Sequence, residues 1–432
     1  MYQRKFVPER TYVLGIHTFK MTRSEAHESV EETMNLVYTA GADLVGSEFV
    51  EIRQFNPSTF IGQGKVEEVK NRLKELNVEL AIVDHQLSPI QNRNLEEAWG
   101  VRVIDRTGLI LDIFAQRAQS KEGKLQVELA QYQYLLPRLV GAWTHFSKQR
   151  GGSIGLRGAG ETQLEVDRRR VRERINMLRK NLKKVACSRE VHRNKRNSVP
   201  IPTLSLIGYT NAGKSTLFNQ LTGSDDVIVE DKLFATLDPK TKKIRLASGQ
   251  KVLVSDTVGF IRNLPLELIE SFKSTFQEVA NADVLLHIID ASHPDRAQQI
   301  KTVENLLVDL GLHHKPVINV LNKIDRLETE LPEGCVLSNA VNGAVKISAL
   351  KGFGIETLLT QVEEKLSLCY YRRLRLLVPH SLGKVLHDLY THGCVISSKN
   401  TAHGSEIEVD LPPKWQNKYE EFVVAAPLGA RV

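Results

Sequence analysis

Cysteine is scarce in this 432-residue chain, and its spacing excludes the sites that cysteines usually build. The chain has four of them, Cys187, Cys335, Cys369 and Cys394, and no two are spaced as CxxC. That spacing is typical of zinc sites, and disulfide frameworks belong mainly to short secreted chains. We therefore expect neither kind of site, and we expect the protein in a reducing cytoplasm.

Long hydrophobic runs are also missing from the sequence. No run reaches about 18 apolar residues, the length that indicates a membrane-spanning helix. Residues 1–6 include basic side chains, but no apolar core and no small-residue cleavage site follow, so no secretory signal is indicated. With 41% hydrophobic and 25% charged residues, the composition is that of a globular protein without a membrane span. The length predicts two to four compact units.

Positive charge is concentrated in one segment. Residues 148–196 hold sixteen Lys or Arg side chains against five acids, a local net charge of +11, whereas the whole chain carries +7. The rest of the chain therefore sums to −4. Such a local excess favours contact with a phosphate backbone, and the alternative is a solvated helix face.

The first part of the chain alternates short apolar runs with helical patterns. In chain order these are 12–16 (strand), 24–40 (helix), 42–52 (strand), 64–76 (helix), 80–84 (strand), 86–99 (helix) and 101–105 (strand). Alternation of this kind predicts a small parallel α/β subdomain, which we assign to residues 1–118.

A helical periodicity replaces this alternation near Leu125. Two apolar stripes follow at steps of three, four and seven residues: Leu125, Leu129, Tyr132, Leu136 and Leu139, then Leu164, Val171, Ile175, Leu178, Leu182 and Val185. Neither helix can bury its stripe alone, so we predict an antiparallel helical hairpin over residues 119–197. Five glycines within residues 150–160 exclude a helix interior and predict a mobile tip loop.

A phosphate-binding loop follows the strand-like run at residues 203–208. Residues 208–215 are Gly-Tyr-Thr-Asn-Ala-Gly-Lys-Ser, and a helical pattern continues from Thr216. This is GxxxxGKS in the strand–loop–helix context that the motif requires. We expect backbone N–H groups to wrap the phosphates, Lys214 to reach the β- and γ-phosphates, and Ser215 to ligate Mg²⁺.

Two further motifs complete a magnesium and γ-phosphate site. A strand ends in Asp256, which we expect to hold Mg²⁺ through water, and Gly259 follows with an N–H that can sense the γ-phosphate. Thr236 lies between the phosphate-binding loop and Asp256, where a switch threonine closes over Mg²⁺ and the γ-phosphate. We assign catalytic roles to Lys214, Thr236 and Gly259, and metal binding to Ser215, Thr236 and Asp256.

A last pair of motifs selects guanine. The apolar run at residues 317–321 leads to Asn322, Lys323 and Asp325. Asp325 can accept the N1 and 2-amino hydrogens of guanine, a pair that adenine lacks, while Asn322 and Lys323 brace the loops and the base plane. Residues 348–350 place backbone N–H groups for the guanine oxygen. The predicted GTP-binding set is Gly208, Tyr209, Thr210, Asn211, Ala212, Gly213, Lys214, Ser215, Thr216, Phe234, Ala235, Thr236, Asp256, Gly259, Asn322, Lys323, Asp325, Ser348, Ala349 and Leu350.

Two residues refine the expected mechanism. Asn211 resembles the position that ligates K⁺ in some GTPases, and the alternative is an asparagine tolerated for turn geometry. Phe260 follows Gly259 where Ras-like GTPases carry the glutamine that orients the attacking water. Because an apolar side chain cannot position water, we expect slow hydrolysis that depends on another residue or a partner.

These motifs resemble those of a known group of proteins. The runs from Asp256 to Ile261 and from Phe234 to Pro239 are similar to those of the Obg–HflX group of translational GTPases. The loop Gly-Leu-Arg-Gly-Ala-Gly-Glu-Thr-Gln-Leu-Glu at residues 155–165, followed by three arginines, resembles the signature of the HflX family. The resemblance covers essentially the whole chain. Ala159 departs from it, since a proline is common there.

Strand and helix patterns alternate again over residues 203–368, and we assign a Ras-like GTPase domain to residues 198–368. Strand-like runs at residues 374–378 and 406–409 indicate a small α+β domain at 369–432. The resemblance implies a monomeric, ribosome-associated GTPase that binds GTP or GDP and the 50S subunit. It also implies that the hairpin loop lies near the peptidyl-transferase centre and that the protein splits or rescues stalled ribosomes. The rRNA-contact candidates are Arg150, Arg157, Arg168, Arg169 and Arg170.

Two questions stay open at this point. The alternative function is a GTP-regulated, RNA-binding assembly factor or scaffold with little turnover. The presence of Lys214, Ser215, Thr236 and Asp256 favours the enzyme, whereas Phe260 keeps the alternative open. An ATP role is also attributed to the family's N-terminal domain. The local candidate, residues 61–65, lacks the P-loop spacing, and we interpret it as a plain strand–helix turn.

Overall fold

The fold consists of two compact units, seen in a computed structural model that describes residues 8–19, 21–140, 163–196, 201–223, 233–262, 273–327, 343–369, 371–401, 403–411 and 413–425. The first unit comprises the described parts of Met1–Ala186, Glu230–Asp238 and Arg262–Lys273. The second comprises those of Cys187–Val229, Pro239–Ile261 and Ser274–Val432. Across this described part of the chain, no helix combines the length and apolar character needed to cross a membrane.

The first unit begins with a four-stranded parallel sheet in the order β2-β1-β3-β4. Its helices follow the predicted alternation, apart from α4, which the sequence analysis missed. That helix begins directly after β4 and is capped by the Asp105 carboxylate, which accepts the Gly108 N–H at 2.8 Å. Its first six residues, 106–111, are all buried, and exposed residues appear only from Asp112 onward, so the start of the helix shows no exposed face. The elements are β1 (Arg10–Thr18), α1 (Arg23–Ala40), β2 (Asp43–Ile52), α2 (Gln63–Glu75), β3 (Leu80–Val83), α3 (Pro89–Trp99), β4 (Arg102–Asp105) and α4 (Arg106–Arg117).

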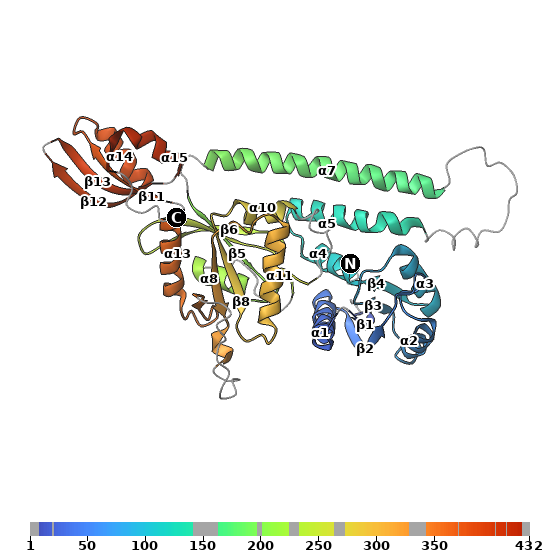
Figure 1. The fold of residues 1–432 in the computed structure, drawn as a ribbon. Helices are drawn as coiled ribbons and strands as arrows, with labels where there is room; N and C mark the ends of the chain where they lie inside the picture. Colours follow the sequence, from blue (N-terminus) through green and yellow to red (C-terminus); the bar gives the residue numbers. More distant parts are fainter. Residues whose placement is uncertain are drawn as a thin grey trace, which may run out of the picture. The chain divides into compact units, whose positions relative to one another are not determined.

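The helical hairpin is confirmed by α5 (Lys121–Leu135), the 3₁₀ helix η1 (Leu136–Val140) and the long α7 (Gln163–Arg196), which runs alongside α5 in Figure 1. Leu129, Ile175 and Leu178 form the buried centre of the seam between α5 and α7. An ion pair between Arg174 and Glu128 closes the seam at its edge. The glycine-rich tip predicted at residues 150–160, with Arg150 and Arg157, lies outside the described residues.

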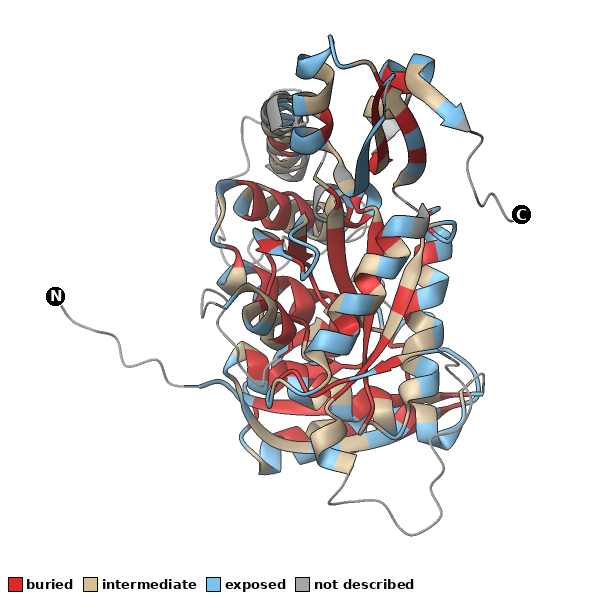
Figure 2. Ribbon diagram, turned by 90° about the vertical axis from the view of Figure 1, so that its left-hand side faces the viewer, coloured by how far each residue is buried: buried red, intermediate tan, exposed pale blue. Residues whose placement is uncertain are grey.

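The second unit holds a six-stranded sheet in the order β10-β9-β8-β5-β7-β6, in which β6 alone is antiparallel to its neighbour. Buried apolar residues of its strands form the core cluster of this sheet. Buried residues are red on the ribbon in Figure 2. The predicted Ras-like α/β fold is therefore confirmed. The elements are β5 (Thr203–Gly208), α8 (Lys214–Thr222), β6 (Lys240–Arg245), β7 (Lys251–Asp256), α10 (Lys273–Asn281), β8 (Val284–Asp290), α11 (Arg296–Asp309), β9 (Val317–Asn322), η2 (Ile324–Arg326), β10 (Val345–Lys346) and α13 (Ile355–Cys369).

A four-stranded antiparallel sheet, in the order β12-β13-β11-β14, follows α13 and has a core cluster of its own. The α+β character expected here is confirmed, although the sequence analysis identified only β11 and β13. The elements are β11 (Arg372–Val378), α14 (Gly383–His392), β12 (Cys394–Thr401), β13 (Gly404–Leu411), α15 (Pro413–Gln416), η4 (Asn417–Phe422) and β14 (Val423–Ala425). The domain boundaries assigned from the sequence stay predictions.

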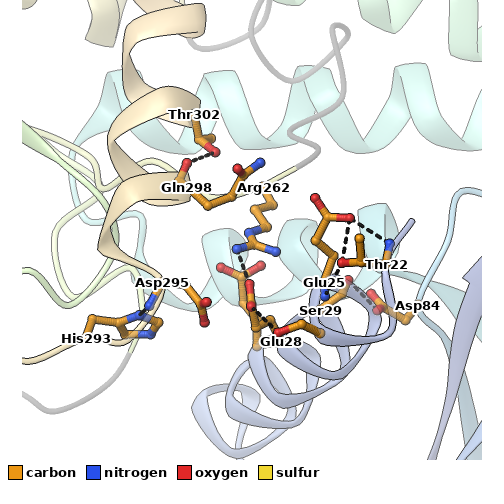
Figure 3. Close-up of polar contacts among 12 residues, drawn as sticks. Thr22, Glu25, Glu28, Ser29, Asp84, Arg262, His293, Asp295, Gln298 and Thr302 are labelled. Carbon is orange, nitrogen blue, oxygen red and sulfur yellow. Dashed lines mark hydrogen bonds and ion pairs between the residues drawn. The ribbon is translucent and has the colours of Figure 1, made fainter. Parts of the chain in front are cut away.

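A buried charge network lies at the carboxyl end of β3 in the first unit. The Asp84 side chain is fully buried and accepts hydrogen bonds from Ser29 and Thr33, both at 2.6 Å, as Figure 3 shows for Ser29. Arg106, whose side chain is 5% exposed, donates to Asp84 at 2.8 Å and also pairs with Glu32. Each charge in the network depends on the others for compensation.

Replacement of Asp84 by alanine removes the partner of a buried guanidinium. We expect Asp84→Ala to lower the free energy of unfolding of the first unit by about 3–5 kcal/mol. Urea unfolding followed by hydrogen exchange of the β1 and β3 amides measures this loss. Glu67→Ala, which removes an exposed carboxylate 3.5 Å from Lys70, is the matched control and should cost less than about 1 kcal/mol. Equal effects of the two substitutions would contradict the network's role.

Candidate functional site

The phosphate-binding loop lies between β5 and α8 in the second unit. β5 is flanked by β7 and β8, and all six of its residues are buried or half-buried. Gly213 caps α8 at φ 92°, in the left-handed region, and a Cβ there would collide with the Asn322 side chain. This position therefore requires glycine, and it leaves the N–H groups at the start of α8 free of a side-chain cap.

Lys214 is buried at the first position of α8. Its Nζ donates to the carbonyl oxygens of Gly208 at 3.1 Å and Tyr209 at 2.6 Å, so the side chain folds back over the loop. Burial lowers the pKa of Lys214 to about 8, against a smaller opposing effect of the Asp256 charge. The ammonium group is thus held inside the loop, and an anion there would favour its charged form.

The predicted metal ligands Ser215 and Asp256 meet at the same edge of the sheet. The Ser215 hydroxyl donates to Asp256 Oδ2 at 2.8 Å, and Asp256 is fully buried at the end of β7. A hydroxyl and a carboxylate in contact are ligands that suit Mg²⁺, which usually takes one or two protein oxygens together with phosphates and waters. In the described part of the chain there is no group of three His, Cys, Asp or Glu side chains that could form an all-protein metal cage.

Gly259 lies against the phosphate-binding loop. The Thr210 N–H donates to the Phe260 carbonyl at 2.8 Å, and the Phe260 N–H donates to Gly208 at 3.1 Å. A Cβ on Gly259 would lie 2.8 Å from Thr210 Cα and 3.0 Å from Lys214 Nζ. The Phe260 side chain, 2% exposed, instead packs in the interior and stacks on Phe276.

The guanine motifs converge through Asn322. Its side-chain amide donates to the Ala212 carbonyl at 2.9 Å, and its Oδ1 accepts the Ala349 N–H at 2.9 Å. One side chain thus joins the phosphate-binding loop to the loop at residues 348–350. The Ser348 hydroxyl donates to Asp325 at 2.6 Å and lowers the pKa of that carboxyl, which keeps it ionised as an acceptor.

Two residues near this site were missed by the sequence analysis. Asp290 ends β8 and pairs with Lys323 Nζ at 2.7 Å, while Lys323 adopts φ 62°. An acid at the end of a largely apolar strand was the available signal for Asp290. His287, buried in the middle of β8, has its pKa lowered by burial to about 4 and is therefore neutral near pH 7. A single histidine within an apolar strand gives no comparable signal.

The structure does not bring every predicted residue together within one unit. Residues of the phosphate-binding loop, Asp256, Gly259, Asn322 and Asp325 all belong to the second unit. Phe234, Ala235 and Thr236 belong to the first unit, so their place in the nucleotide site stays a prediction.

The basic face of α7 carries the described rRNA-contact candidates. Arg169 and Arg170 are exposed, and each lies near an acid of the same helix, Glu173 at 3.9 Å and Asp167 at 3.5 Å respectively. Arg168 is half-buried at the same end of the helix. Since Ile175 and Leu178 are buried against α5, the exposed charges line the opposite face.

The buried ammonium of Lys214 predicts a pH dependence of nucleotide binding. A bound phosphate raises the lysine pKa above its value of about 8 in the free protein, so binding takes up a proton once the pH exceeds 8. Between pH 7 and 9, GDP affinity should therefore fall as pH rises, by at most about tenfold per pH unit above 8. Fluorescent-GDP titrations measure this, and Lys214→Arg should abolish the dependence. A flat wild-type profile would contradict the assignment.

Comparison with known proteins finds family models along most of the chain. They are described as the GTP-binding GTPase N-terminal region over residues 27–115, the GTP-binding GTPase middle region over 117–196, and a 50S ribosome-binding GTPase over 203–323. The three models follow the chain order of the sheet, the hairpin and the phosphate-binding fold.

Curated relatives match almost the full length. GTPase HflX of Magnetococcus marinus is 42% identical over 94% of this chain and 93% of its own. GTPase HflX of Caldanaerobacter subterraneus subsp. tengcongensis is 44% identical over 96% of this chain and 94% of its own. GTPase HflX of Escherichia coli is 44% identical over 85% of both chains. The loops joined by Asn322 are thus those of a guanine-nucleotide enzyme, and the chain belongs to the HflX family of GTPases.

Proposed function

We propose that this GTPase binds the large ribosomal subunit and uses GTP binding and hydrolysis to split or rescue stalled ribosomes. The observation that carries the proposal is the basic helical hairpin, whose seam is buried between α5 and α7 while exposed arginines line α7. A rigid rod of this kind can neutralise rRNA phosphates along its length. The family description as a 50S ribosome-binding GTPase supports the same partner.

The contacts of the loop support the proposed magnesium and phosphate roles. Ser215 would hold Mg²⁺ directly and Asp256 through water, and the ion would neutralise phosphate charge. Lys214 would exchange its loop carbonyls for the β- and γ-phosphates, and the Gly259 N–H would sense the γ-phosphate. Thr236, placed by motif order, would close over the metal and the γ-phosphate when GTP is bound.

Two residues define how hydrolysis is controlled. Because the Phe260 side chain is buried against Phe276, it cannot reach a water at the γ-phosphate, which supports slow hydrolysis that a partner accelerates. Asn211 adopts φ 60°, a conformation that asparagine tolerates well. Turn geometry therefore accounts for Asn211 without K⁺, although a K⁺ ion at this position stays part of the proposal.

The second candidate function is a GTP-regulated RNA-binding assembly factor with little turnover. The buried Phe260 side chain favours this second function, because position 260 then supplies no side chain that could orient the attacking water. GTP turnover measured with and without 50S subunits separates the two functions. We expect marked stimulation by 50S subunits, and its absence would favour the assembly factor.

Base selection by Asp325 is testable through the substrate. Asp325→Asn replaces an acceptor with a side chain that can also donate, so the variant should lose guanine affinity and gain affinity for xanthine, which carries oxygen in place of the 2-amino group. We expect a loss for GDP of at least about a hundredfold, since an unpaired buried polar group costs roughly 1–3 kcal/mol and a charge-assisted bond more. Fluorescent GDP and XDP titrations measure both. Unchanged GDP affinity would exclude Asp325 from the base site.

The rRNA contact of α7 is testable by salt dependence. Arg169→Ala with Arg170→Ala should weaken 50S association and reduce the slope of log affinity against log salt by about one unit per phosphate contact removed. Lys74→Ala with Lys301→Ala removes the same charge elsewhere on exposed helices and is the matched control. Co-sedimentation over a salt series provides the measurement. Equal slopes for the two double variants would argue against the hairpin as the contact.

A further inference from the structure

A short segment that lies between α8 and β6 in sequence, residues 233–238, belongs to the first unit. The Asp238 carboxylate accepts hydrogen bonds from the N–H groups of Gln119 at 2.9 Å and Ser120 at 2.7 Å, both through Oδ2. Its Oδ1 accepts the Ser120 hydroxyl. Asp238 thus satisfies donors at the amino end of α5, where the helix dipole also favours a negative charge.

The first turn of α5 is shaped to admit this carboxylate. Ser120 is the N-cap, and its hydroxyl oxygen accepts the Gly123 N–H at 2.8 Å while its hydrogen goes to Asp238. A Cβ built on Gly123 would collide with Asp238 Oδ1. Glycine at this helical position costs stability relative to alanine, and the approach of Asp238 gives a physical reason for it.

The residues before Asp238 are docked on the same unit. Phe234 is 2% exposed and meets the Phe114 ring edge-on, with the centroids 4.7 Å apart. Its φ of 55° is unusual for a bulky residue and persists only where packing enforces it. The Leu233 N–H donates to the Thr39 hydroxyl at 3.2 Å. Packing on helices α1 and α4 therefore fixes the backbone that leads to Thr236.

The residues after Asp238 enter the sheet of the second unit at once. β6 begins at Lys240, which pairs in register with Asp256, the predicted magnesium-holding acid. Asp238 is therefore held at the first turn of α5, two residues before the chain enters β6. Thr236 is two residues upstream, within about 7 Å of Asp238 along the backbone. Its position is set by where Asp238 is held.

Helix α5 is itself anchored at its far end, which makes it a firm support. The Asp105 carboxylate accepts hydrogen bonds from the Tyr134 hydroxyl and from Arg138, each at 2.8 Å, and Arg138 also stacks on the Tyr134 ring. Asp105 closes β4 and is fully buried. Arg262, which also belongs to the first unit, is held by an ion pair with Glu28 of α1 (Figure 3).

We propose that Asp238 is a positioning residue for GTP hydrolysis. Its hydrogen bonds to the start of helix α5 form an anchor that fixes the backbone position of Thr236. Asp238 does not touch the nucleotide and acts only through the chain that it fixes. The proposal rests on the proposed role of Thr236 at Mg²⁺ and the γ-phosphate. The proposal predicts that breaking the anchor lowers the affinity for GTP, whose γ-phosphate Thr236 is proposed to contact. The affinity for GDP, which lacks the γ-phosphate, should not change.

Two variants break the anchor from opposite sides. Asp238→Asn keeps the shape but removes the charge, whereas Gly123→Ala leaves the switch segment chemically unchanged and fills the space that Asp238 occupies. Each should lower the affinity for a fluorescent, non-hydrolysable GTP analogue, measured with Mg²⁺, by about fivefold, which is the scale of a lost helix cap. GDP affinity should stay within twofold, and kcat should fall. Gly383→Ala, an exposed glycine at the start of α14 with nothing within 4 Å of its Cβ, should change none of these.

The full-length protein is used throughout. Retained GDP affinity shows that the second unit is folded, and unchanged hydrogen exchange of the β1 and β3 amides shows that the first unit is folded. An unchanged ratio of GTP-analogue to GDP affinity in both Asp238→Asn and Gly123→Ala would overturn the proposal. Faster hydrolysis in either variant would also overturn it, because the contact would then be inhibitory. Thr236→Ala distinguishes failure of the proposed Thr236 role from failure of the proposed Asp238 anchor. If it leaves the affinity for the analogue unchanged, the proposed role of Thr236 fails, whatever the anchor variants show.

Discussion

The nucleotide site depends on a constraint of parallel sheets, namely that strands running the same way end at one edge. β5 lies between β7 and β8, and β9 follows β8, so Gly208, Asp256, Asp290 and Asn322 come to the same edge from distant parts of the sequence. The crevice outside these ends is where open α/β sheets bind ligands. Every loop contact of the site builds on this placement.

The loops at this edge are joined by polar contacts rather than by apolar packing. Asn322 holds the phosphate-binding loop and the guanine loop together, and Ser215 is already in contact with Asp256. Because these groups are oriented by the protein, ligand binding requires little reorganisation of them. Lys214 is the exception, since it must leave its own loop carbonyls to reach a phosphate.

The described residues of segments 230–238 and 262–273 belong to the first unit, although the phosphate-binding fold of the second unit flanks them in sequence. Their contacts reach Ser120 from Asp238, Thr39 from Leu233 and Glu28 from Arg262, across 118, 194 and 234 residues of sequence. These long-range contacts all lie within the unit that carries the basic hairpin.

Residue order alone determined the motifs, because phosphate, magnesium and guanine recognition require fixed residue types at fixed local spacing, as in residues 208–215 and 322–325. Periodicity alone also determined the parallel α/β unit and the paired stripes of α5 and α7. Tertiary structure decided what depends on distant partners: the buried first half of helix α4, the Asp290–Lys323 ion pair, and the hydrogen bonds of Asp238 to the start of α5. The sequence around Asp238 belongs to the GTPase motifs, and no local pattern reveals that its partners are Ser120 and Gly123. Only the folded chain brings them together.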